Sequence, residues 1–97
     1  MLLKESVADY LVTLPHTVSD LLVGLESSDA QEVAYEARIL KNQAEKCDAQ
    51  MLRECADKME QVAIAGDLDT AWSLIPELHE HLRQALLLLQ RSEYYAS

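Results

Sequence analysis

Glycine, proline and phenylalanine are scarce in this chain, whose 97 residues include two glycines, two prolines and no phenylalanine. Because glycine and proline interrupt helices, their scarcity permits long uninterrupted helices. The alternating runs of Val, Ile and Thr that are typical of strands are also absent from the sequence. Hydrophobic residues still make up 49% of the chain, which is enough for one packed core. The sequence therefore predicts a single all-α domain over residues 1–97, because a second core would not fit in this length.

Basic residues are few as well, since eight Lys and Arg stand against 17 Asp and Glu, for a net charge of −9. Nucleic acids and anionic membrane surfaces are bound through clustered Lys and Arg, so this balance argues against both classes of partner. It is compatible with a basic protein partner, although acidity more often serves solubility. Several carboxylates are expected to form solvated faces: Glu26, Asp29, Glu32, Glu36 and Glu45.

Segments that would direct the chain to or across a membrane are not found. The start lacks the basic region and the long apolar stretch of a signal peptide. The run from Leu86 to Leu89 is four residues long, whereas about 20 apolar residues are needed to span a bilayer. Cys47 and Cys55 lie in one helical stretch about 12 Å apart along the axis, which is too far for a disulfide. We therefore expect two reduced thiols in a cytoplasmic protein.

Apolar residues recur at helical spacing almost throughout the chain. Turn signals at residues 27–29, at Asp48 and at Gly66-Asp67 separate the predicted helices. Short loops force consecutive helices to run antiparallel, which predicts an up-down-up-down four-helix bundle. Pro15 either starts a new helix or kinks a longer one, so a short extra N-terminal helix before Pro15 is an open alternative. One last helix is expected after the Gly66-Asp67 turn, with inward residues from Ala71 to Leu89.

One exposed patch is predicted in the middle of the helix that contains Ala37. On a helical wheel of about 100° per residue with Ala37 at zero, the apolar residues centre near about −40°. Arg38, Asn42 and Glu45 then point roughly 140°, 180° and 120° away from the core, and Lys41 lies at the boundary. These four residues form one polar surface far from either end of the helix.

The residues around this patch resemble the central motif of histidine-containing phosphotransfer (HPt) domains, four-helix bundles with a solvent-exposed histidine that accepts phosphate. That motif reads approximately Ala-His-x-Leu-Lys-Gly-Ser-Ala, and residues 37–44 of this chain read Ala-Arg-Ile-Leu-Lys-Asn-Gln-Ala. A turn follows at Asp48-Ala49, and Leu52, Ala56 and Glu60 match the family's leucine, small residue and glutamate. The resemblance covers about residues 7–90 and implies an HPt-like bundle.

The departures from the family pattern are concentrated where its chemistry occurs. Arg38 replaces the phosphate-accepting histidine, Asn42 replaces the glycine one turn later, and Asp48 replaces the turn glycine. Lys41 matches the family's lysine, which helps to hold phosphate charge. A guanidinium stays protonated and is not nucleophilic, so Arg38 cannot accept phosphate. The resemblance therefore implies a module that has no catalytic residue and is not an enzyme.

The function implied by the resemblance is docking without phosphotransfer in a two-component phosphorelay. The implied partner is a response-regulator receiver domain or a hybrid sensor kinase, and the implied receiver-binding residues are Arg38, Lys41, Asn42 and Glu45. The planar fork of Arg38 suits a carboxylate or a phosphoryl group. The alternative is a structural or homodimerising bundle with no phosphorelay role, in which Arg38 is an ordinary solvated residue. An exposed apolar surface on the first helices would favour this alternative.

Other chemistries find little support in the sequence. None of His16, His79 and His81 is followed three residues later by the lysine that marks the family's acceptor. His79 and His81 are two residues apart, whereas the His-Glu-x-x-His pattern of zinc proteases needs a spacing of four. The chain has no recognisable nucleophile constellation and no glycine-rich nucleotide loop. We therefore expect no metal, no cofactor and no enzymatic activity.

Overall fold

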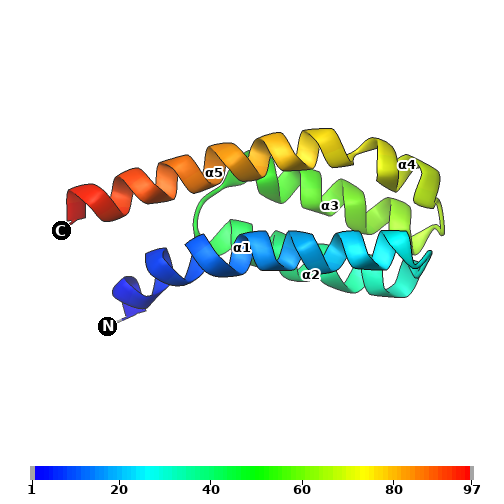
Figure 1. Cartoon of the computed structure of the whole chain (residues 1–97), viewed down its shortest axis with the longest axis horizontal. Helices are drawn as coiled ribbons and strands as arrows, with labels where there is room; N and C mark the ends of the chain where they lie inside the picture. The colour runs from blue at the N-terminus through cyan, green and yellow to red at the C-terminus, as the bar shows by residue number, and fades with distance from the viewer. Residues whose placement is uncertain (1, 97) are drawn as a thin grey trace.

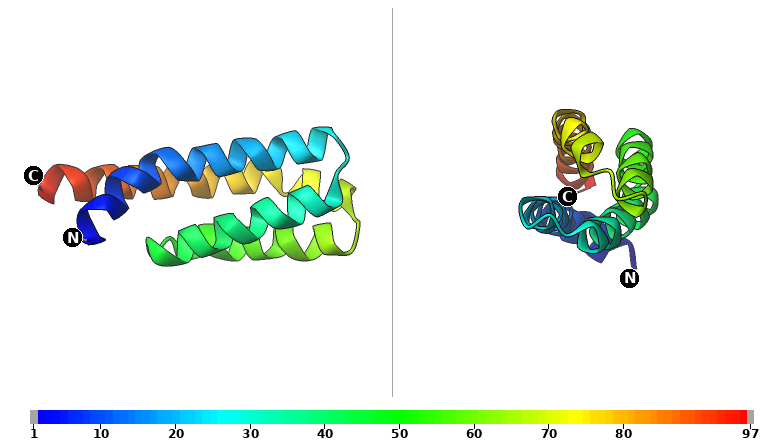
Figure 2. Two further views of the ribbon diagram at one scale, coloured as in Figure 1. Left: turned by 90° about the horizontal axis from the view of Figure 1, so that it is seen from below. Right: turned by 90° about the vertical axis from the view of Figure 1, so that its right-hand side faces the viewer.

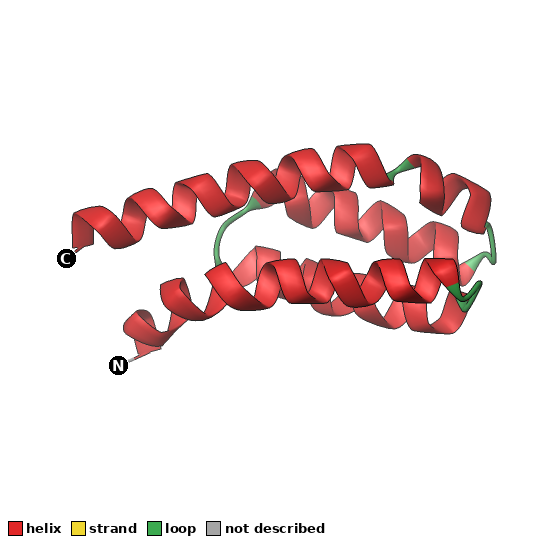
Figure 3. Ribbon diagram, viewed as in Figure 1, coloured by secondary structure: helices red, strands yellow, loops and turns green. Residues whose placement is uncertain are grey.

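The computed structural model describes residues 2–96, with side chains described for residues 8–91. Over this range the chain forms five helices joined by short loops (Figures 1 and 3). They are α1 (Leu2–Glu26), α2 (Ala30–Lys46), α3 (Gln50–Ile64), α4 (Leu68–Ser73) and α5 (Ile75–Ala96). The described residues contain no strand, so the prediction of an all-α protein is confirmed.

The four long helices surround a common centre. Contacts join α1 to α2, α2 to α3, α3 to α5, and α5 back to α1. The end-on view in Figure 2 shows these helices placed around one axis. In Figures 1 and 2 both chain ends lie at the same end of the molecule, where α1 and α5 extend beyond the turn that joins α2 and α3. The short α4 lies at the opposite end.

The core is built from aliphatic side chains and alanine rather than from aromatic rings. Its largest fully buried members are Leu14, Leu21, Leu25, Leu40, Leu52, Met59, Leu78, Val33 and Cys55. With the other buried residues, which include Leu82, Ala85 and Leu89 of α5, they recur at helical spacing on the inner face of each long helix, as the sequence pattern predicts. Full burial of one such side chain contributes about 1.5–3 kcal/mol to folding. The packed core therefore fixes which face of α2 and α3 is turned toward solvent.

Three helix ends close with the same backbone turn. Ser28, Asp48 and Gly66 have positive φ angles of 56°, 60° and 77°. After each of them a backbone N–H donates back to a carbonyl of the preceding helix: Asp29 to Gly24 at 2.9 Å, Ala49 to Ala44 at 2.8 Å, and Asp67 to Val62 at 2.9 Å. This left-handed ending favours glycine, yet only one of the three positions has it. Each turn reverses the chain within three residues, which holds neighbouring helices side by side.

The two prolines occupy different places in their helices. Pro15 lies inside α1, which continues unbroken on both sides, so the alternative of a short extra helix before Pro15 is wrong. An internal proline costs about 3 kcal/mol because it removes one helical hydrogen bond and crowds the preceding turn. Leu14 and Val18 are buried on either side of it, and their packing offsets that cost.

The break occurs instead near Pro76, between α4 and α5. The prediction of one last helix is therefore wrong, because α4 ends at Ser73 and α5 begins at Ile75, with Leu74 between them. Pro76 is the second residue of α5, where its missing N–H has no helical acceptor to lose. A proline at this position favours the start of a new helix over the extension of α4.

Candidate functional site

Helix α2 carries all four residues of the predicted patch. The Asp29 side chain accepts a hydrogen bond from the Glu32 backbone N–H at 3.1 Å and so caps the start of this helix. Burial of Val33, Ala37, Leu40 and Ala44 sets its rotation. Arg38, Asn42 and Glu45 are exposed and Lys41 is half-buried, which matches the orientation expected from the wheel. Their role in binding remains a prediction.

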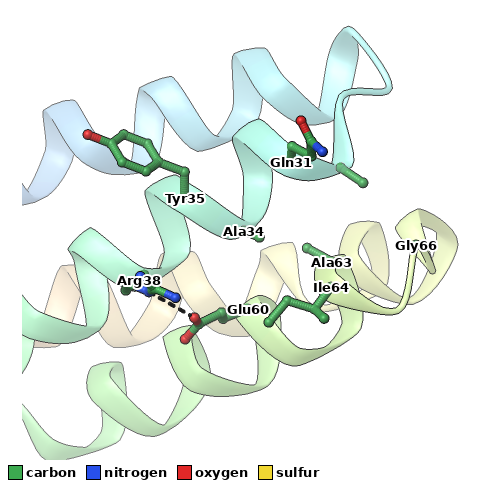
Figure 4. Close-up of a pocket in the computed structure, with 9 residues that line it drawn as sticks. Gln31, Ala34, Tyr35, Arg38, Glu60, Ala63, Ile64 and Gly66 are labelled. Atoms are coloured by element: carbon green, nitrogen blue, oxygen red, sulfur yellow. Dashed lines mark hydrogen bonds and ion pairs between the residues drawn. The ribbon is translucent and has the colours of Figure 1, made fainter.

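Arg38 and Lys41 meet two carboxylates of α3. Arg38 Nε donates to Glu60 Oε2 at 3.3 Å, and Lys41 Nζ donates to Glu60 Oε1 at 2.8 Å. Lys41 Nζ also lies 3.2 Å from Asp57 Oδ1. Figure 4 shows Arg38 and Glu60 pointing toward each other across the space between the helices. We call these four side chains, Arg38, Lys41, Asp57 and Glu60, the Arg38 cluster.

The inner part of the cluster is enclosed. The Glu60 side chain is 6% exposed and that of Lys41 is 26% exposed. Hydrogen bonds from Lys41 and Arg38 lower the pKa of Glu60, although burial acts in the opposite direction. Hydrogen bonds to Glu60 and Asp57 raise the pKa of Lys41. Glu60 is therefore an anion and Lys41 a cation, and each is already engaged with the other.

Arg38 is the most exposed member of the cluster. Its side chain is 68% exposed, and among the described residues it donates a single hydrogen bond, from Nε. The two Nη groups of its guanidinium remain available to a ligand. Because guanidinium N–H groups bind carboxylates in a planar fork, Arg38 presents a site for an oxyanion.

An apolar groove of about 440 Å³ lies beside Arg38, between α2 and α3 (Figure 4). Arg38 and Glu60 form one end of it, and Gly66 lies at the other. Exposed Tyr35 and Ile64 contribute to its walls, and the small side chains of Ala34 and Ala63 leave room between the helices. The groove can therefore accept an apolar side chain next to a group held by Arg38.

Asn42 and Glu45 are not part of this arrangement. Among the described residues, neither has a hydrogen bond or an ion pair through its side chain. Glu45 lines a separate, smaller hollow of about 190 Å³, together with Arg53. The structure thus brings together Arg38 and Lys41 of the predicted patch and leaves Asn42 and Glu45 outside the cluster.

Asp57 and Glu60 were not predicted as partners of the patch. The signal that could have found them is the short turn between α2 and α3. In an antiparallel hairpin, a step forward along one helix is matched by a step back along the other. Three residues separate Arg38 from Lys41, and three separate Glu60 from Asp57 in the reverse order. The groove was missed because it depends on small residues from two helices.

Glu36 is a second buried carboxylate, and its expected place on a solvated face is wrong. Its side of α2 faces α1, and the residue is only 8% exposed. Burial, a hydrogen bond with Glu32 and the charge of Asp20 raise the pKa of Glu36 to about 7. His16 lies 3.4 Å from Asp20 and opposes this shift.

The histidines and cysteines form no reactive constellation within the described residues. His81 Nε2 lies 3.7 Å from Glu77 Oε2. No group of three or more His, Cys, Asp or Glu among these residues is placed to hold a metal ion. Cys47 and Cys55 are free thiols, and burial raises the pKa of both, that of Cys55 to about 11. Both cysteines are therefore protonated and poorly nucleophilic at neutral pH.

No helix in the described part of the chain is long and apolar enough to cross a membrane. No protein-family model, no curated protein and no solved structure matches the chain. Its function is therefore inferred from its own residues and their geometry.

Proposed function

We propose that this chain is an HPt-like four-helix bundle that has lost phosphotransfer and docks to a receiver domain of a two-component phosphorelay. The observation that carries the proposal is the place of Arg38. It lies exposed in the middle of α2, at the position where the resembled family carries its phosphate-accepting histidine.

Several features outside Arg38 support an HPt-like arrangement. Lys41 lies one turn after Arg38 and faces the same seam between α2 and α3. Asp48 has a φ of 60°, which is the conformation that a glycine favours, and the resembled family has a glycine at this turn. Glu60, the match to a family glutamate, holds both Arg38 and Lys41. These three positions lie in α2, in the turn after it and in α3, and they match the spacing of the family motif.

The chemistry at the site favours binding over phosphoryl transfer. The Arg38 guanidinium stays protonated at any physiological pH, so it offers no lone pair to attack a phosphoryl group. Asn42 adds a side chain one turn away, where the family has glycine. A receiver domain presents an aspartate carboxylate, and the free Nη groups of Arg38 can donate to such a group.

A phosphotransfer and binding assay tests the proposal. Receiver domains of the source organism are titrated with the wild-type chain and with Arg38→Ala. We expect at least one receiver to bind, and we expect Arg38→Ala to weaken that binding by about tenfold or more, because an arginine at the centre of an interface is a common hot spot. Arg83→Ala is the matched control, since Arg83 is exposed on α5 and pairs with Glu80.

The same assay, run with phosphorylated receivers, separates docking from transfer. The wild-type chain should take no label, and the Arg38→His, Asn42→Gly double variant should become labelled. A labelled wild-type chain would show that another residue accepts phosphate and would contradict the proposal. Equal affinity of wild type and Arg38→Ala for a receiver would show that Arg38 does not contribute to docking.

A homodimerising bundle is the second candidate, and one observation favours it. Val12 and Val23 of α1 are both exposed. They lie three turns apart, on the same outward face of the helix, as their spacing of eleven residues requires. A second copy of the chain could cover both. Light scattering after size exclusion tests this: a dimer that Val12→Asp dissociates, together with no binding to any receiver, would favour this function over docking.

A further inference from the structure

The Arg38 cluster has no net formal charge, because its two cations are matched by two carboxylates. The same position in the resembled family handles a phosphoryl group, which carries roughly two negative charges. A site that receives such a group would be expected to hold surplus positive charge. Here there is no surplus positive charge, because the negative charges of Asp57 and Glu60 neutralise Arg38 and Lys41.

Lys41 is committed to the protein's own acids. Its ammonium is 2.8 Å from Glu60 and 3.2 Å from Asp57, and the side chain is largely covered. Two of the three N–H donors of its ammonium are thus taken by these carboxylates. Glu60 is nearly inaccessible, so its negative charge stays in place when a partner approaches. Arg38 is therefore the more exposed of the two cations of the cluster, and its Nε already donates to Glu60.

The groove next to Arg38 supplies affinity that does not depend on charge. Its walls include Tyr35, Ala34, Ala63 and Ile64, and its volume of about 440 Å³ is enough for an apolar side chain. Burial of apolar area there contributes about 25 cal/mol per Å² whatever the charge of the neighbouring group. A partner can thus bind at this face through apolar contact together with a single negatively charged group on Arg38.

We propose that this face selects the unphosphorylated state of its receiver, binding a single aspartate carboxylate through Arg38 and an adjacent apolar side chain in the groove. The inference rests on the proposed docking function and specifies which state of the partner is bound. Phosphorylation replaces the single carboxylate charge by roughly two charges on the phosphoryl oxygens. These charges would lie close to Glu60 and Asp57, and like charges brought together at an interface oppose binding.

The test compares each receiver in two states. Receiver domains of the source organism are titrated by calorimetry in Mg²⁺ buffer, with and without beryllium fluoride, which binds the receiver aspartate as a phosphoryl mimic. We expect the wild-type chain to bind the beryllium-fluoride form about tenfold more weakly or worse. Tighter or equal binding of that form would overturn the inference and leave docking itself in place.

Variants of the cluster test whether its charge is the cause. The double variant Asp57→Asn, Glu60→Gln keeps the side-chain shapes and gives the cluster a net positive charge. We expect it to lose the preference or to reverse it. Asp57→Asn alone, at a half-exposed position, should reduce the preference and should not prevent folding. Glu54→Gln is the matched control, because Glu54 is exposed on α3 and pairs with Gln50 outside the cluster.

The outcomes separate the two proposals. A preference that persists unchanged in both Asp57→Asn and the double variant would overturn the charge argument. If no receiver binds in either state, the docking function fails, and the selection of state fails with it.

Discussion

Two glutamates buried to the same degree behave in opposite ways in the two seams of α2. Glu36, in the seam with α1, is 8% exposed, and Glu60, in the seam with α3, is 5% exposed. Burial raises the pKa of Glu36 to about 7, whereas the pKa of Glu60 is lowered. The difference lies in their neighbours. Glu36 is surrounded by Glu32, Asp20 and a single histidine, while Glu60 is held by Lys41 and Arg38.

The comparison shows that burial alone does not decide the charge of a carboxylate. Burial disfavours the anion at both sites, and a hydrogen-bonded cation outweighs that effect at one of them. The seam with α3 therefore holds a charged carboxylate at neutral pH. The seam with α1 carries a carboxyl that takes up a proton near neutrality, and it weakens the fold when that proton is lost.

Replacing Glu60 should have the largest effect. We expect Glu60→Gln to lower the free energy of unfolding by about 2–3 kcal/mol at pH 7, because Lys41 and Arg38 lose an anionic partner. The folded-state pKa of Glu60 is lowered, so its contribution is present above the unfolded pKa of about 4.3 and is lost as the pH falls. Urea unfolding of wild type and variant at pH 7 and pH 4 measures the loss of stability at each pH. Glu54→Gln serves as the control. A cost that grows toward low pH would contradict the assignment.

Replacing Glu36 should raise the free energy of unfolding rather than lower it. Its folded-state pKa is about 7, above the unfolded value, so its stabilising contribution is complete below about pH 4.3 and is lost as the pH rises through about 7. Glu36→Gln avoids burying a charge, and we expect it to stabilise the chain by about 1–2 kcal/mol at pH 8 and by little at pH 5. Urea unfolding across this range measures the difference. A variant less stable than wild type at pH 8 would contradict the comparison.

The two cations should contribute unequally to the state of Glu60. Lys41 makes the shorter bond and is the more enclosed, so Lys41→Met should raise the pKa of Glu60 more than Arg38→Met does. NMR titration of the Glu60 carboxyl carbon in each variant measures this order. The reverse order would mean that Arg38 lowers the pKa of Glu60 more than Lys41 does. Arg38 would then be bound more tightly to Glu60 and less available to a partner.

The smallest effect is expected from a neighbour of Glu36. Asp20→Asn removes one of the charges that raise the pKa of Glu36, so NMR titration should show a lower value than in wild type. We expect the free energy of unfolding at pH 8 to rise by about 0.3 kcal/mol, as is usual for a partly solvated charge pair. An unchanged titration of Glu36 would assign its shift to burial and Glu32 alone.

The periodicity of α2 was sufficient to predict its exposed face. Arg38 and Asn42 point outward because their positions on a helical wheel lie opposite the buried face that contains Ala37 and Leu40. The Glu60 contacts could not be predicted in this way, since they depend on how α2 and α3 are aligned across a turn. Glu36 was misplaced for the same reason, because its side of α2 is polar in sequence and only the approach of α1 buries it.

The prolines mark another limit of sequence analysis. Pro15 and Pro76 have the same local chemistry, yet one is carried inside a helix and the other starts one. Buried Leu14 and Val18 hold the helix together around Pro15. Near Pro76 the chain has just left the six-residue α4, so a break costs little packing. Local propensity allows a proline either to start a helix or to lie within one, and tertiary packing decides which of the two occurs.

Both chain ends lie at one end of the bundle. The lining of the groove beside Arg38 extends to the other end, where α2 begins and α3 ends, and includes Ala30 and Gly66. An affinity tag, a fluorescent fusion or a surface linker attached at either terminus would thus leave the groove unobstructed. Immobilisation by either end should therefore give the same binding curve, because neither attachment covers the groove.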